Sequence, residues 1–200
     1  VMGCVPLSAA ESEWIQLFNE SNLDGWQKDV PGGKAEVVDG DIHLSTEQKG
    51  KFFLMFDKTF SDFIFEGEVK MPEGKSNSGF MFRSHWDKEK GKVFGYQAEV
   101  DPGSRAWSGA LFDEKRRRYF ISPNRDHAES EAQKQASIDA FRQRAGDSFK
   151  RDDWNQYRIE CKGVHIKIFV NGTLTTDVHD KMDASGYFGL QHHGEQGKRY

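Results

Sequence analysis

The residues best suited to chemistry lie in the stretch GYQAEVD, residues 95–101. If this stretch is a β-strand, its side chains alternate between two faces, so Gln97, Glu99 and Asp101 share one face while the residues between them point into a core. Two carboxylates about 7 Å apart along a strand repel each other unless a cation, a donor or a substrate lies between them. The pattern predicts either a site that handles a substrate or a solvated edge strand.

Neighbouring carboxylates on one face tend to raise each other's pKa, which suits a group that transfers protons. Arg83 ends a predicted strand at residues 78–83 and would supply a positive charge, or would only neutralise the acids as an ion pair. His193 ends the last predicted strand and is either a donor or a solvated terminal residue. Glu99, Asp101 and His193 would suit a divalent metal, but no spacing signature supports one, so we predict no metal ligands and keep a divalent ion only as an alternative.

Aromatic side chains that could stack on a sugar ring are Trp107, Tyr96 and Trp86, although aromatic residues in β-sandwiches are mostly core. Trp107 is the strongest of these because it follows the 95–101 strand directly. We expect the remaining substrate contacts from polar residues near the same strands, namely Gln97, Gln191, Asn77 and Asp113.

Short alternating segments separated by turn signals predict the elements that hold these residues. Asp39-Gly40 and Asn171-Gly172 are two-residue hairpin turns, because both dipeptides tolerate the positive φ that such turns demand. Residues 126–145 instead have helical composition, with Asp126 as a possible N-cap and Gly146 as the end. The sequence therefore predicts an all-β fold, two antiparallel sheets packed as a jelly-roll sandwich, with one helical surface insertion.

Composition limits the class of protein. The 200 residues include 16 Phe, 5 Trp and 20 Gly, and the net charge is -4. We expect a single β-rich domain over residues 14–200. No long basic block points to nucleic acid, no apolar run is long enough to span a membrane, and two cysteines without a CxxC pair exclude a zinc knuckle.

Residues 1–13 begin with the apolar stretch VMGCVPLSAA. We expect this segment to be the remnant of an export signal or a flexible terminus. Residues 1–4 resemble a bacterial lipobox, in which Cys4 would carry a lipid anchor, whereas Ser8-Ala9-Ala10 is an alternative cleavage site. Either export interpretation predicts a periplasmic, surface-anchored or secreted bacterial protein.

Six motifs in order resemble the 3-keto-disaccharide hydrolase domain family, over residues 14–200. They are LFN with LDGW at 17–26, NSGFMFR at 77–83, GYQAEVD at 95–101, WNQYRI at 154–159, VNG at 170–172 and GLQHH at 189–193. The resemblance implies a concanavalin A-like sandwich with a sugar site on its concave sheet, and hydrolysis of 3-keto-glycosides made by a sugar 3-dehydrogenase. The usual Arg-rich closing strand of the family is absent beyond Tyr200, and the helical stretch is variable in the family.

A 3-keto group acidifies the proton at C2, so the leaving group at C1 can depart by elimination before water adds back. This route needs a base, a donor for the enolate oxygen and an acid for the departing alcohol. We expect Glu99 or Asp101 to be the base, and Arg83, His193 or Gln191 to supply the donors.

Three alternative functions fit the same sequence less well. Glucanases of this fold use Glu-x-Asp with a further Glu, two carboxylates standing about 5 Å apart, and Pro102-Gly103-Ser104 lacks that third acid. A non-catalytic carbohydrate-binding module would need the aromatic platform and not the acids. A pure scaffold has little use for paired acids beside Arg83.

Overall fold

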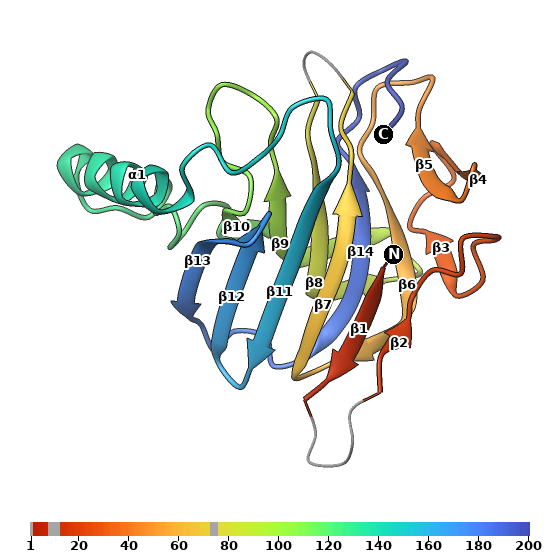
Figure 1. The fold of residues 1–200 in the computed structure, drawn as a ribbon, viewed down its shortest axis with the longest axis horizontal. Helices are drawn as coiled ribbons and strands as arrows, with labels where there is room; N and C mark the ends of the chain where they lie inside the picture. Colours follow the sequence, from red (N-terminus) through yellow and green to blue (C-terminus); the bar gives the residue numbers. More distant parts are fainter. Residues whose placement is uncertain (1, 8–12, 73–75) are drawn as a thin grey trace.

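Two antiparallel sheets face each other across a hydrophobic core in the computed structural model, which describes residues 2–7, 13–72 and 76–200 (Figure 1). The first sheet runs in the order β13 (Thr173–His179), β12 (His165–Val170), β11 (Asn155–Lys162), β7 (Phe63–Val69), β1 (Gly3–Pro6), β2 (Ile15–Gln16). The second runs β10 (Leu111–Glu114), β9 (Lys92–Val100), β8 (Ser78–Asp87), β14 (Gly186–His192), β6 (Phe52–Phe60), β3 (Trp26–Lys28). The predicted jelly-roll sandwich is confirmed.

Side-chain alternation lets the second sheet bury one face in the core and present polar residues on its other face. On β9, Tyr96, Ala98 and Val100 belong to the core between the sheets, so Gln97 and Glu99 point to the outer face. The strands β8 and β14 alternate in the same way, and both predicted hairpin turns occur, joining β4 (Lys34–Val38) to β5 (Asp41–Ser45) and β12 to β13. The outer face of this sheet is therefore free to form a site.

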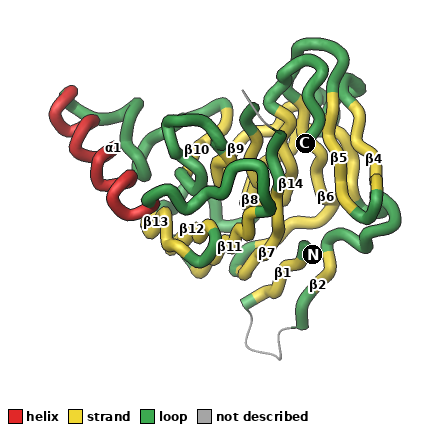
Figure 2. Tube along the Cα trace, turned by 45° about the horizontal axis from the view of Figure 1, so that its top comes forward, coloured by secondary structure: helices red, strands yellow, loops and turns green. Residues whose placement is uncertain are grey.

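One helix, α1 (Glu131–Ala145), occurs in the described part of the chain and lies at the edge of the sandwich beside β13 (Figure 2). Its N-cap is Ser130, which accepts a hydrogen bond from the Gln133 amide, rather than the expected Asp126. Asp126 instead accepts the main-chain N–H of Tyr119. Gly146 ends the helix as expected. No described helix is long and apolar enough to cross a membrane.

The amino-terminal segment differs from the expected flexible terminus. Residues 3–6 form β1, which pairs with β7, and Cys4 is fully buried in the core. Burial raises the pKa of the Cys4 thiol to about 12, and a lipid on this sulfur would require β1 to leave the sheet. The alternative cleavage site at residues 8–10 lies outside the described residues. The folded unit thus begins before the predicted boundary at residue 14.

Arg83 does not lie on the outer face, and this prediction was wrong. A β-bulge interrupts the pairing of β8 with β9 between Met81 and His85, and Arg83 has a φ of 41° within it. The bulge breaks the two-residue period, so the side chain turns inward. There the guanidinium, 1% exposed, donates to the carbonyls of Ser61 and Gly163 and pairs with Asp62. Arg83 therefore joins the loop at residues 61–62 to the turn at Gly163, away from the outer face.

We expect Arg83→Met to lower the free energy of unfolding by about 3 kcal/mol or more, because buried carbonyls and a carboxylate lose their cationic partner. Arg158→Met is the matched control, since Arg158 pairs with Glu66 and Glu160 at a more exposed position and its loss should cost at most about 1 kcal/mol. Urea denaturation measures both. Equal, small losses would contradict the structural role of Arg83.

Candidate active site

The carboxylate of Glu99 lies at the centre of a polar network on the outer face of the second sheet. Its Oε1 accepts hydrogen bonds from Asn77 Nδ2 at 2.8 Å and from the Tyr119 hydroxyl at 2.9 Å, and Arg105 Nη2 lies 3.4 Å away. Its Oε2 accepts one bond, from Gln97 Nε2 at 3.0 Å. Because a carboxylate oxygen has two lone pairs, Oε2 keeps one free among the described residues, whereas Oε1 is saturated.

Two glutamine amides continue the network from Glu99 toward β14. Gln191 Nε2 donates to Gln97 Oε1 at 2.8 Å, while the buried Gln191 Oε1 has no partner within the described residues. Gly79, directly opposite Glu99 on β8, makes room for this arrangement, because a Cβ there would lie 2.4 Å from Gln97 Nε2. A buried amide oxygen without a partner is uncommon, and this one lies among the residues that line the cleft.

Asp101 has a structural role in the turn after β9, unlike Glu99. Its Oδ1 accepts the amide of Gly103 at 3.0 Å, and its Oδ2 pairs with Arg105 Nε at 2.7 Å. Asp101 thus shapes the turn after β9 and fixes one side of the Arg105 guanidinium, whose other side reaches Glu99 and Tyr119. Both carboxylates therefore share one cation.

Burial raises the pKa of the Glu99 carboxyl above its ordinary value, since the charged form loses its hydration. The hydrogen bonds from Asn77 and Tyr119 and the charge of Arg105 oppose this rise, and the negative charge of Asp101 adds to it. The carboxylate is thus a stronger base than an exposed glutamate, and it stays within reach of a cation.

His193 faces the same cleft from the end of β14. Its Nδ1 lies 2.9 Å from Glu195 Oε1, which orients the ring, while Nε2 has no hydrogen-bond partner in the described ranges. The side chain is 47% exposed and so can meet a ligand. Lys51 and Glu114 form an ion pair of 3.0 Å at this end of the site. The site thus offers both a carboxylate and an imidazole.

These side chains line one cleft of about 440 Å³, a volume suited to a small ligand. Six predicted site residues meet there: Glu99, Asp101, His193, Gln97, Gln191 and Asn77. The cleft is also lined by residues that sequence reasoning did not assign to the site, among them Lys51, Arg105, Phe112, Glu114, Arg118, Tyr119, Arg125 and Glu195.

Tyr96 and Asp113 are not in the cleft, contrary to prediction. They pair directly across β9 and β10, so both lie on the face turned toward the core. The Tyr96 hydroxyl donates to Asp180, and Asp113 is fully buried between Arg116 and Arg117 at 2.7 and 2.6 Å. Arg116 and Arg117, which follow β10, are accordingly half-buried in ion pairs.

Trp107 is not an exposed sugar platform either. Only 3% of it is exposed, because its ring packs edge-on against Tyr119 at 4.7 Å. The guanidinium of Arg105 lies over the outer side of the ring, 4.4 Å from its centre. Trp86 packs against Tyr187 and does not line the cleft. Of the predicted stacking residues, Trp107 and Tyr96 are therefore buried, and Trp86 is partly buried outside the cleft.

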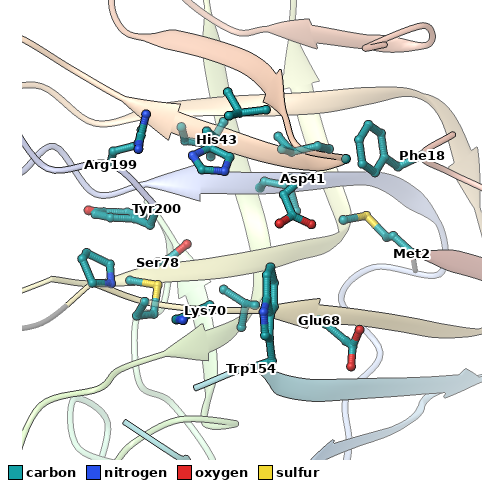
Figure 3. Close-up of a pocket in the computed structure, with 18 of the residues that line it drawn as sticks. Met2, Phe18, Asp41, His43, Glu68, Lys70, Ser78, Trp154, Arg199 and Tyr200 are labelled. Carbon is teal, nitrogen blue, oxygen red and sulfur yellow. The ribbon is translucent and has the colours of Figure 1, made fainter. Parts of the chain in front are cut away.

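A larger cavity, about 870 Å³, lies apart from these residues and contains none of the predicted site residues (Figure 3). Apolar side chains from the end of the sandwich form much of its wall, and Asp41, His43 and Trp154 face it (Figure 3). No hydrogen bond joins Asp41 to His43. We assign the chemistry to the smaller cleft, because there the polar groups form a connected network around a buried carboxylate.

No group of three or more His, Cys, Asp or Glu side chains in residues 2–7, 13–72 and 76–200 is arranged to hold a metal ion. The conceivable set of Glu99, Asp101 and His193 is engaged otherwise, since Asp101 pairs with Arg105 and His193 with Glu195. A guanidinium thus occupies the position between the two acids that a cation would need.

The family profile described as the 3-keto-alpha-glucoside-1,2-lyase-like domain matches residues 13–198. The chain belongs to this family. The resemblance drawn from the six motifs is thereby confirmed, and four of these motifs lie largely on strands β8, β9, β11 and β14 of this domain.

Relatives of the lyase-like domain include levanase of Bacillus subtilis strain 168, which is 26% identical over 172 residues. The match covers 85% of this chain and 21% of levanase, so the chain spans about a fifth of that relative's length. Among solved structures, the carbohydrate binding module CBM66 from Bacillus subtilis has a TM-score of 0.54 at 18% identity, covering 88% of this chain and 89% of its own. A candidate glycosyl hydrolase from Parabacteroides distasonis ATCC 8503 has a TM-score of 0.60 at 13% identity, covering 92% and 91%. These likenesses establish the fold.

We expect Tyr119→Phe to raise the pKa of Glu99 further, because the anion loses a hydrogen-bond donor while its burial remains. A carboxyl ¹³C NMR titration of the folded protein measures this. Tyr157→Phe is the matched control, since the Tyr157 hydroxyl donates to the main-chain oxygen of Glu99 and not to its carboxylate. A fall in the Glu99 pKa in the Tyr119 variant, or equal shifts in both, would contradict the assigned network.

Proposed function

We propose that this domain cleaves the glycosidic bond of 3-keto-glycosides or 3-keto-disaccharides by elimination followed by hydration. The observation that carries the proposal is the buried Glu99 carboxylate, which has a raised pKa, one unused lone pair on Oε2 and a guanidinium beside it. Membership in the lyase-like family supports the same chemistry.

The chemistry begins with the substrate. A ketone at C3 makes the hydrogen at C2 acidic, because the electrons left behind delocalise onto the ketone oxygen as an enolate. When the enolate reforms the ketone, a double bond forms between C1 and C2 and the alcohol at C1 leaves. Water then adds at C1 and a proton returns to C2, which gives a free 3-keto sugar and an alcohol.

Glu99 is the base in this proposal, and Oε2 is the atom that takes the C2 proton. Desolvation makes the carboxylate more basic, while its fixed hydrogen bonds hold the side chain in one position. Asp101 is less suited to this role, because its carboxylate forms the shorter ion pair with Arg105, at 2.7 Å against 3.4 Å for Glu99, and also holds the turn after β9 through the amide of Gly103.

Arg105 takes the part that was first expected of Arg83, the stabilisation of the enolate oxygen. Its guanidinium lies between the two acids at the cleft wall and is 36% exposed, so it can reach a ligand. A fixed positive charge at the place where negative charge develops lowers the barrier to proton removal. Gln191 Oε1 would accept a sugar hydroxyl group.

His193 would donate the proton that the departing alcohol needs and later accept one from the incoming water. Its Nδ1 is held by Glu195, which leaves Nε2 to face the cleft. The substrate itself must come from a reaction that oxidises the C3 hydroxyl group, so a sugar 3-dehydrogenase is the implied partner. Export of the protein, predicted from its first residues, would place this reaction outside the cytoplasm.

The second candidate function is carbohydrate binding without turnover. The likeness to CBM66 over most of both chains favours it, as does the match to a fifth of levanase. The buried positions of Trp107 and Tyr119 argue against it, because the cleft then lacks the broad aromatic surface that such a module would use. Failure of the parent protein to turn over keto-glycosides or ordinary glycosides would favour this function.

We expect Glu99→Gln to lower kcat/KM on a 3-keto-glucoside at least about 100-fold, because the amide cannot accept the proton. Binding of the same substrate, measured by calorimetry, should persist because the shape of the cleft is kept. Glu66→Gln is the control, since Glu66 lies on the opposite sheet and pairs with Arg158. Unchanged turnover in the Glu99 variant would remove this residue as the base.

Cleavage in D₂O should give a 3-keto sugar with deuterium at C2, because the proton that returns to C2 comes from solvent. The measurement is mass spectrometry of the product at early times, with the Glu99→Gln protein reporting spontaneous exchange. Direct displacement at C1 leaves the C2 hydrogen in place, so a product without deuterium would overturn the elimination route while leaving glycoside cleavage intact.

A further inference from the structure

A second apolar cluster, separate from the main core, lies directly behind the active site. It consists of Trp107, Ala110, Tyr119, Ile138, Phe141 and Ala145, with Phe112 packed against it. The last three of its buried members belong to α1, and their spacing places them on one face of the helix. The helix is therefore joined to residues of the cleft wall by a shared core.

The ring of Tyr119 is confined on several sides. Trp107 and Phe112 each pack edge-on against it, with ring centres 4.7 Å away, and the guanidinium of Arg125 lies 4.6 Å from its centre. Only its hydroxyl reaches the network, where it donates to Glu99. The position of this donor therefore depends on how the cluster behind it is packed.

Arg105 depends on the same cluster. Its guanidinium lies 4.4 Å over the ring of Trp107 and donates to the Tyr119 hydroxyl at 3.1 Å. The chain that follows α1 supports the same loop, because Arg151 donates to the carbonyls of Pro102 and Gly103 at 3.0 and 3.4 Å. The two donors near Glu99, the Arg105 guanidinium and the Tyr119 hydroxyl, thus contact groups that belong to or pack with α1 and the chain that follows it.

We propose that α1 positions the active site, with Phe141 as the residue that anchors the helix. Phe141 is 1% exposed and is the largest side chain that α1 contributes to the cluster. Phe141 shares its apolar cluster with the rings of Trp107 and Tyr119, and these two rings contact Arg105 beside the carboxylate. The consequence for catalysis rests on the proposed function of Glu99, whereas the positioning itself does not.

The test compares Phe141→Ala with Phe60→Ala, which removes an equally apolar ring from the main core at the end of β6 remote from the cleft. Two readouts are taken on folded protein: the NMR titration of the Glu99 carboxyl, and the pH profile of kcat/KM on a 3-keto-glucoside. We expect Phe141→Ala to raise the Glu99 pKa, because the donors that oppose its rise move away.

We also expect kcat/KM of Phe141→Ala to fall about tenfold or more, with its acid limb moved to higher pH, since small misplacements of catalytic groups are costly. Phe141→Leu should recover most of both properties, and Phe60→Ala should change stability alone. If Phe141→Ala does not fold, Ile138→Ala gives the same readouts with a smaller loss of packing.

A folded Phe141→Ala protein whose Glu99 titration matches that of the parent would overturn the proposal. Absence of turnover in the parent on keto-glycosides would instead refute the proposed function, and the NMR titration would still decide whether α1 positions Glu99. The two failures are therefore distinguishable.

Discussion

The site depends on the burial of one carboxylate on the outer face of a sheet. An ionised carboxyl group that leaves water must recover its hydrogen bonds from the protein, or it becomes protonated. Glu99 recovers them from Asn77 before β8, from Gln97 on β9, and from Arg105 and Tyr119 in the loops beyond. The same requirement that keeps Glu99 charged thus draws four separate segments of the chain into one cleft.

Alternation along strands is the part of this arrangement that the sequence could predict. The two-residue period placed Gln97 and Glu99 on one face, and the same rule placed Gln191 and His193 opposite Phe188 and the other core residues of β14. The period fails where a strand is irregular. Nothing in the stretch FMFRS signals the bulge that gives Arg83 a positive φ, so counting by twos put its side chain on the wrong face.

Residues in the loops could not be placed by any period. Asp101, Arg105 and Tyr119 meet because a turn, a cluster of rings and an inserted helix bring them together over different sequence distances. Arg116 and Arg117 are likewise held by Asp183 and Asp180 from the distant connection between β13 and β14, which local sequence does not reveal. The one available signal was an aromatic residue, Tyr119, directly after the basic run.

The unequal engagement of the two acids limits the chemistry that the cleft can perform. A retaining glycosidase needs a second carboxylate that is free to attack C1 or to donate a proton. Asp101 has both oxygens bound, one to the amide of Gly103 and one to Arg105, so it cannot leave its position without opening the loop that carries the cation. In the proposed function the cleft therefore uses one buried base, one fixed positive charge and the imidazole of His193 on a sugar whose C2 hydrogen is already acidic. A substrate already oxidised at C3, as we propose, would account for a cleft in which Glu99 alone serves as the carboxylate base.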